Sequence, residues 1–174
     1  RGLKYEQEFK NNMNEYSDAK ITKTKCKPYT KISWLTDFDR FGVEKFSNDM
    51  IYLMVRRIYD ISGITGEKVN IYYNSKKIKC NTFGKYIDLY LDGNNKIYEE
   101  IHNRWQVGVS VTTSDKFEHY SFVNGIATLK GGKHVDYITK QITSKLAEYI
   151  NKKHKKDVPE NYIKNYLKIF INSV

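Results

Sequence analysis

The feature that most constrains the fold is a hydrophobic period that changes along the chain. Residues 104–113, RWQVGVSVTT, alternate apolar and polar side chains, which predicts a half-buried strand. From Lys133 onward apolar residues recur every three or four positions, which predicts a long amphipathic helix. Residues 167–174, LKIFINSV, return to a strand-like pattern. Strands and helices arranged in this order indicate an α+β fold rather than a doubly wound sheet.

The first third of the chain predicts strands followed by one helix. Residues 4–13 and 18–38 read as strands, because in the second stretch Ile32 and Trp34 alternate with polar neighbours. A helix is predicted to begin after Ser47, a favourable N-cap residue, and to end near Gly63.

The middle of the chain predicts a hairpin, a short helix and a strand pair. Residues 68–80 read as a hairpin with its turn at Asn74 and Ser75, and residues 82–91 as a helix capped by Asn81 or Thr82. The composition of residues 92–96, DGNNK, predicts a loop. Residues 119–123, HYSFV, are expected to pair antiparallel with the strand at 104–113 across the turn SDKF.

The long helix has a clear apolar stripe and a clear end. Thr139 and Thr143 are expected to lie off that stripe, and Pro159 prevents simple continuation of the helix. The predicted stripe consists of Val135, Ile138, Ile142, Leu146, Tyr149 and Ile150.

The composition limits the class of protein. The hydrophobic content of 40% is enough for a packed core, and no apolar run approaches the roughly 18 residues of a membrane span. The formal net charge of +10 favours a polyanionic partner, with nucleic acid first and anionic lipid second.

Cys26 and Cys80 are far apart without metal-ligand spacing, so no metal site is predicted. The four histidines are scattered, and no catalytic constellation emerges.

Residues 129–134, LKGGKH, precede the long helix and contain a double glycine. Backbone N–H groups at a helix start can bind phosphate, but neither the Walker spacing nor the dinucleotide-binding spacing is present. Gly131 and Gly132 therefore favour a structural turn, with an anion site as the alternative.

A lysine cluster follows the same helix. Residues 133–168 contain nine Lys against four acidic residues. These cations could complement the dipole at the C-terminal end of the helix, or they could contact DNA phosphates. Composition leaves both readings open.

One long segment resembles a known family. Residues 121–146, SFVNGIATLKGGKHVDYITKQITSKL, are similar to the transducer segment of eukaryotic-type DNA topoisomerase II. There a strand ending in F-V-N is followed by I-A-T, two glycines, a basic residue, His and a long helix. The resemblance extends to IYLMVRRIYDISG, KVNIYYNSKKIK, FGKYIDLYL and LKIFINSV, and is loose only over the first 25 or so residues.

The resemblance implies a domain organisation. Residues 1–80 would be the C-terminal strands and last helix of a GHKL ATP-binding domain, and residues 81–174 a transducer domain with the ribosomal S5 domain 2-like fold. In that family, ATP closes a homodimer that captures a second DNA duplex. The resemblance therefore implies a type II DNA topoisomerase that uses ATP and Mg²⁺, acts on double-stranded DNA and works in the nucleus, without membrane association.

The resemblance also implies roles for single residues. Thr30 matches the threonine that helps hold the adenine end of ATP, although Thr36 stands where the family has Pro before Asp37. Asn151, Lys152 and Lys153 align with a basic triplet that touches DNA, so one cation is lost at Asn151. Lys155 and Lys156 are the candidates to compensate for that loss. Gly131 and Gly132 match the family glycines and are interpreted as shaping the turn.

The working residues of ATP hydrolysis are expected outside these 174 residues. The catalytic glutamate, the metal-binding asparagine and the glycine-rich lid would precede Arg1, and the switch lysine would follow Val174. No catalytic residue is therefore predicted in this chain, which alone should hydrolyse no ATP. The alternatives are a stand-alone S5-like nucleic-acid-binding module without enzymatic activity, an inert structural piece with solvated lysines, and a bacterial-type gyrase subunit.

Overall fold

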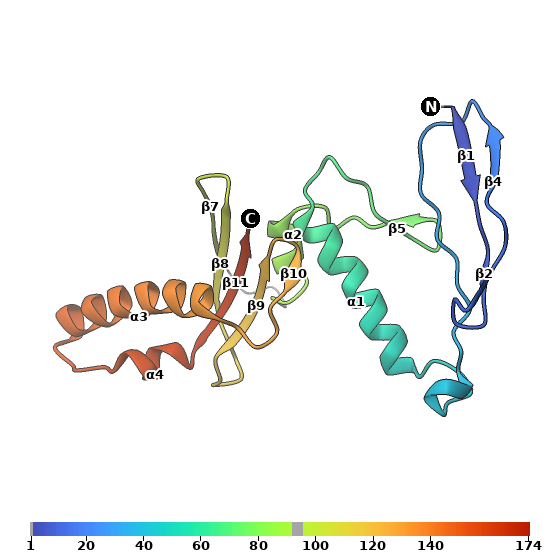
Figure 1. Cartoon of the computed structure of the whole chain (residues 1–174). Coiled ribbons are helices and arrows are strands. Elements are labelled where there is room, and N and C mark those ends of the chain that lie inside the picture. The colour runs from blue at the N-terminus through green and yellow to red at the C-terminus, as the bar shows by residue number, and fades with distance from the viewer. Residues whose placement is uncertain (1, 92–95) are drawn as a thin grey trace. The chain divides into compact units, whose positions relative to one another are not determined.

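The computed structural model describes residues 2–91 and 96–174, and the chain divides into two compact units, Arg1–Lys45 and Phe46–Val174 (Figure 1). The expected loop at 92–96 falls almost wholly outside the described residues. These units divide well before residue 80, so the helix and hairpin that follow residue 45 fold with the second unit. The family-based domain boundary near residue 80 stays a prediction.

The first unit consists of small antiparallel ribbons. Strand β1 pairs with β4, β2 pairs with β3, and none of the residues 2–45 is buried. Isolated two-stranded ribbons have marginal stability, because neither face is covered. The elements of this unit are β1 (Leu3–Glu6), β2 (Phe9–Lys10), β3 (Glu15–Tyr16), β4 (Lys20–Lys23) and the short 3₁₀ helix η1 (Asp39–Phe41).

The strand expected around Ile32 and Trp34 is absent from the described part of the first unit. Residues 27–37 carry no regular secondary structure, and Ile32 and Trp34 are 78% and 72% exposed. A strand needs a neighbour to satisfy its backbone groups, and no segment of this unit pairs with residues 31–35. Apolar and polar side chains do alternate here, but strand pairing depends on the tertiary structure. The prediction of a strand at these residues was therefore wrong.

Helix α1 (Asn48–Ile64) begins where the sequence predicts and ends at Ile64, next to the predicted end near Gly63. The Ser47 hydroxyl accepts a hydrogen bond from the Met50 backbone N–H, as an N-cap residue should. Gly63 does not stop the helix, because α1 continues to Ile64. A β-carbon on Gly63 would lie 2.6 Å from Cβ of Tyr86, so this glycine permits the close approach of the next helix.

The predicted hairpin and second helix are confirmed. Strands β5 (Tyr72–Tyr73) and β6 (Lys76–Lys77) pair antiparallel, and Asn74 and Ser75 between them both have positive φ. Helix α2 (Phe83–Asp88) is capped by Thr82, whose hydroxyl accepts a hydrogen bond from the Lys85 backbone N–H.

A five-stranded sheet with the order β10-β9-β11-β8-β7 forms the centre of the second unit. Strand β11 is parallel to β9 and antiparallel to β8. The direct pairing of β9 with β8 that the sequence suggested is therefore wrong. The last strand is the most buried of the sheet and lies between them. The strands are β7 (Ile97–Ile101), β8 (Trp105–Val111), β9 (Glu118–Val123), β10 (Ile126–Ala127) and β11 (Leu167–Ser173).

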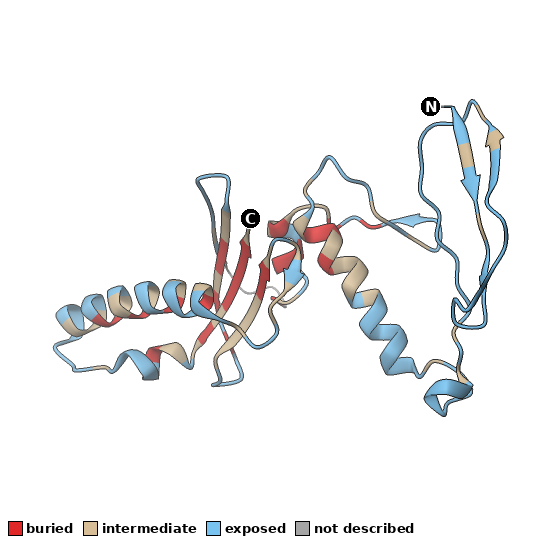
Figure 2. Cartoon of the chain, viewed as in Figure 1, coloured by how far each residue is buried: buried red, intermediate tan, exposed pale blue. Residues whose placement is uncertain are grey.

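The sheet has a separate core on each face. Phe170 of β11 joins a cluster with Phe83, Tyr86 and Ile87 of α2. Ile169 and Ile171 of the same strand join a second cluster, to which α3 contributes. Successive residues of a strand point to opposite faces, so one short strand supplies both clusters. Figure 2 shows this buried centre in red.

Helix α3 (Lys133–His154) has the predicted length, and most of the predicted stripe is confirmed, because Val135 is buried and Ile138, Ile142 and Leu146 pack against the cluster on that face of the sheet. Val135, Thr139, Thr143 and Ala147 are its buried residues, whereas Tyr149 is exposed. The two threonines were expected off the stripe, and that prediction was wrong because helix α4 (Glu160–Lys164) returns along α3 and packs against it. Among the described residues, none of the helices combines the length and apolar character needed to span a membrane.

Candidate nucleic-acid interface

The lysine cluster lies at the C-terminal end of α3 and in the turn that follows. Lys152 and Lys153 belong to the last helical turn, Lys155 is the C-cap residue, and Lys156 follows it. All four side chains are exposed. The Lys153 Nζ donates a hydrogen bond of 3.1 Å to the Tyr149 hydroxyl and lies 5.3 Å from the centre of that ring. Four exposed cations and a tyrosine thus gather on one end of the unit.

Asn151, the fifth residue predicted to bind DNA, has a different environment. Its side chain is half-buried, and its Oδ1 accepts a hydrogen bond of 2.8 Å from the Val158 backbone N–H. Asn151 therefore differs from the neighbouring lysines, because its amide oxygen is engaged in a hydrogen bond within the protein.

The double glycine forms a turn at the start of α3. Gly131 and Gly132 have φ values of +74° and +149°, in the region that favours glycine. The Gly131 N–H donates to the Thr128 carbonyl, and a β-carbon on Gly131 would lie 3.3 Å from Nε2 of His119. The backbone conformation of the turn therefore accounts for a glycine at each of the two positions.

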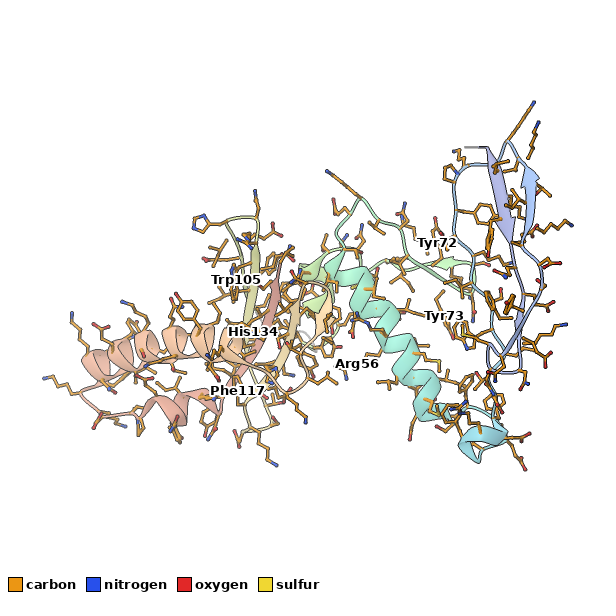
Figure 3. The ribbon with its side chains drawn as sticks, viewed as in Figure 1. Arg56, Tyr72, Tyr73, Trp105, Phe117 and His134 are labelled. Carbon is orange, nitrogen blue, oxygen red and sulfur yellow. The ribbon has the colours of Figure 1, made fainter. Side chains whose placement is uncertain are left out.

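A cluster of polar side chains connects that turn to strand β9, and the sequence analysis did not predict this cluster. The Thr128 hydroxyl lies 3.1 Å from Nε2 of His134 and 2.6 Å from the Ser121 hydroxyl, which is in turn 3.4 Å from Nδ1 of His119. Burial lowers the pKa of His119, and the nearby His134 and Lys164 add to that effect. Figure 3 labels His134 at the beginning of α3. The four side chains fasten the loop before α3 to strand β9.

A cavity of about 330 Å³ opens between α1 and β9 within the second unit. Its walls include Arg56, labelled in Figure 3, whose guanidinium lies 5.9 Å from the centre of the Tyr120 ring. Asp60 and Glu118 line the same cavity and oppose the charge of Arg56. The cavity therefore places one guanidinium beside two carboxylates.

Thr30, the residue predicted to bind nucleotide, lies in the first unit. It is exposed and belongs to the irregular stretch between β4 and η1. One exposed hydroxyl does not form a nucleotide site by itself. Within residues 2–91 and 96–174, no group of three or more His, Cys, Asp and Glu side chains could hold a metal ion. The described residues thus do not by themselves form a site for ATP with Mg²⁺.

Comparison with known proteins identifies the family. The family model described as DNA gyrase B matches residues 65–174. The chain is 42% identical to DNA topoisomerase 2 of Saccharomyces cerevisiae and 39% identical to DNA topoisomerase 2 of Arabidopsis thaliana, over 98% of this chain in both cases. Among solved structures, the ATPase region of Saccharomyces cerevisiae topoisomerase II superimposes with a TM-score of 0.84 at 38% identity, covering 99% of this chain and 45% of that one.

These matches define the class as the ATPase region of type II DNA topoisomerases, as the resemblance implied, and confirm the predicted α+β fold. The chain belongs to the DNA gyrase B and topoisomerase II family, and the two curated relatives named above are eukaryotic enzymes. It spans 13% of the length of the Saccharomyces cerevisiae protein and 12% of the length of the Arabidopsis thaliana protein.

Proposed function

We propose that this chain acts as part of an ATP-dependent type II DNA topoisomerase, in which it couples ATP binding and hydrolysis to the passage of one DNA duplex through another. The observation that carries the proposal is the similarity of nearly the whole chain to the ATPase region of topoisomerase II. The proposed partners of the whole enzyme are ATP with Mg²⁺, double-stranded DNA and a second copy of the same subunit, and the proposed location is the nucleus.

Within that function, the end of α3 would contact the transported DNA. Lys152, Lys153, Lys155 and Lys156 are exposed and carry no acidic partner among the described ion pairs. Lysine ammonium groups bind phosphates as point charges, so such a surface holds DNA without reading its sequence. That behaviour suits an enzyme that must transport any duplex.

The two proposed functional regions carry different parts of the task. Thr30 in the first unit would contribute a hydroxyl to an ATP site completed by residues outside this chain. The lysines of the second unit would respond to DNA. Because neither region contains a complete catalytic set, we propose that residues 1–174 alone neither hydrolyse ATP nor cleave DNA.

The test uses an extended protein that carries this chain with both flanking segments of the family's ATPase region. ATP turnover is measured with and without duplex DNA in the unaltered protein and in Lys152→Ala/Lys153→Ala. We expect DNA to stimulate turnover, and the double variant to lose that stimulation at an unchanged basal rate.

A matched control removes the same charge elsewhere. Lys76→Ala/Lys77→Ala alters two exposed lysines of β6 and should keep the stimulation. If the extended protein shows no ATP turnover at all, the proposed function is wrong. If both double variants lose stimulation equally, the effect is one of net charge and the end of α3 has no particular role.

A further inference from the structure

The amide of Asn151 joins two segments that the chain separates by a reversal of direction. Helix α3 ends at His154, residues 155–159 are irregular, and α4 begins at Glu160. The Asn151 Oδ1 accepts the Val158 N–H at 2.8 Å, which ties the last turn of α3 to the far end of the irregular segment.

A second tie lies one residue beyond Pro159. The Glu160 carboxylate accepts hydrogen bonds from the Ser144 hydroxyl at 2.8 Å and from the Thr143 hydroxyl at 3.4 Å. At its start, the segment is fixed by Lys155, whose φ of +51° turns the chain out of the helix. Lys155 and Lys156 therefore lie in a turn anchored on both sides.

We propose that Asn151 is a positioning residue of the DNA-contacting surface, and that its amide holds the turn 155–158 so that Lys155 and Lys156 stand beside Lys152 and Lys153. This inference rests on the proposed DNA contact and deepens it. It assigns Asn151 a role different from the direct DNA contact that the resemblance implied.

The chemistry of the amide supports this assignment. The Oδ1 atom accepts the Val158 N–H, so of the polar atoms of this amide only Nδ2 could donate to a phosphate. Asn151 is half-buried, whereas the four lysines are exposed. A turn that is ordered before binding has already lost its conformational freedom, so its cations bind phosphate at a lower entropic cost.

The same chemistry distinguishes asparagine from a basic residue at this position. Lysine has no acceptor atom and cannot accept the Val158 N–H. A basic residue at 151 would therefore add one charge and release the turn. Asparagine at 151 lacks that charge, but it fixes the turn that carries Lys155 and Lys156. Together with Lys152 and Lys153, these two residues still give a surface of four lysines.

The test measures binding of a short mixed-sequence DNA duplex to the extended protein over a range of salt concentrations. Asn151→Ala should weaken binding by roughly threefold to tenfold, the effect expected from one lost hydrogen bond. Asn151→Lys should also bind more weakly than the unaltered protein, although it adds a positive charge. The matched control Asn161→Lys places the same charge on an exposed position of α4 and should not weaken binding.

Two further measurements separate positioning from general destabilisation. Amide hydrogen exchange at Val158 should accelerate in both Asn151 variants, while the thermal midpoint of the protein changes little. Asn151→Ala should weaken binding no further when Lys155 and Lys156 are already alanine, because the turn then has no cations to place.

The outcomes distinguish this inference from the function on which it rests. Equal or tighter DNA binding by Asn151→Lys, or additive effects of Asn151→Ala and Lys155→Ala/Lys156→Ala, would overturn the positioning role. If Lys152→Ala/Lys153→Ala and Lys155→Ala/Lys156→Ala both leave DNA binding unchanged, the proposed DNA contact itself fails and the positioning role fails with it.

Discussion

The two compact units of this chain differ most in what they bury. In Phe46–Val174, two apolar clusters cover opposite faces of one sheet, and Phe170, Ile169 and Ile171 are fully buried. In Arg1–Lys45, no described residue is buried, and Trp34 and Leu35 are 72% and 99% exposed. The second unit supplies its own core, whereas the first has apolar side chains but no second layer to pack them against. Folding stability within this chain should therefore reside in the second unit.

The largest effect should come from a truncation in the second core. Phe170→Ala removes a fully buried ring and should lower the free energy of unfolding by about 3–5 kcal/mol. Trp34→Ala removes a larger ring from the first unit and should change it by less than about 0.5 kcal/mol. Urea unfolding followed by circular dichroism measures both, and similar losses in the two variants would contradict the contrast between the units.

A smaller effect is expected where two helices of the second unit meet. Gly63→Ala places a β-carbon 2.6 Å from Cβ of Tyr86, and this overpacking should cost about 1–3 kcal/mol of unfolding free energy. Gly84 in α2 is the matched control, since its nearest neighbour would be 3.8 Å away. Gly84→Ala should be neutral or stabilising by up to about 1 kcal/mol. Thermal unfolding of both variants checks this, and equal destabilisation would show that packing against Tyr86 is not the cause.

The sheet of the second unit should also lose stability in acid through Glu118. Hydrogen bonds from Ser114 and Thr112, together with Lys168 at 3.1 Å, lower the pKa of the Glu118 carboxyl. A carboxyl whose pKa is lower in the folded state stabilises the fold above its unfolded pKa, and this contribution is lost as the pH falls through the folded pKa.

In Glu118→Gln, the thermal midpoint should therefore fall less steeply between about pH 5 and pH 3 than in the unaltered protein. Glu99→Gln removes the same charge from an exposed position of β7 and should keep the original slope. Parallel slopes for Glu118→Gln and the unaltered protein would remove Glu118 from the acid response.

The smallest effect is expected from comparing the reactivity of the two cysteines, one of which lies in each unit. Cys26 is exposed, whereas Cys80 is buried, and burial raises the pKa of the Cys80 thiol to about 11. Only the thiolate reacts with disulfide reagents, so at about pH 8 Cys26 should react first and Cys80 only on unfolding. Absorbance of the released thiol follows both phases, and Cys26→Ser should abolish the fast phase alone. A single fast phase of two thiols would mean that the second core opens readily.

Local signals in the sequence determined the helices and turns of the second unit. Ser47 and Thr82 cap the helices that they were predicted to cap, and Asn74 with Ser75 forms the predicted hairpin turn. The position of the lysines at the end of the long helix followed from the 3.6-residue period and from Pro159. These features depend on residues within a few positions of one another, so a single stretch of sequence contains the whole cause.

The tertiary structure decided everything that depends on a distant partner. Strand β11 lies between β8 and β9 because its side chains can be buried on both faces, which no local pattern of β8 or β9 reveals. Thr139 and Thr143 are buried because α4 returns along α3, and position 63 requires glycine because Tyr86 packs against it. For the candidate site, the sequence located the cations, but the bond from Asn151 to Val158 exists only because the chain reverses before Pro159. Charge can be read from residue types, whereas the position of each charge depends on contacts that form only when the chain folds.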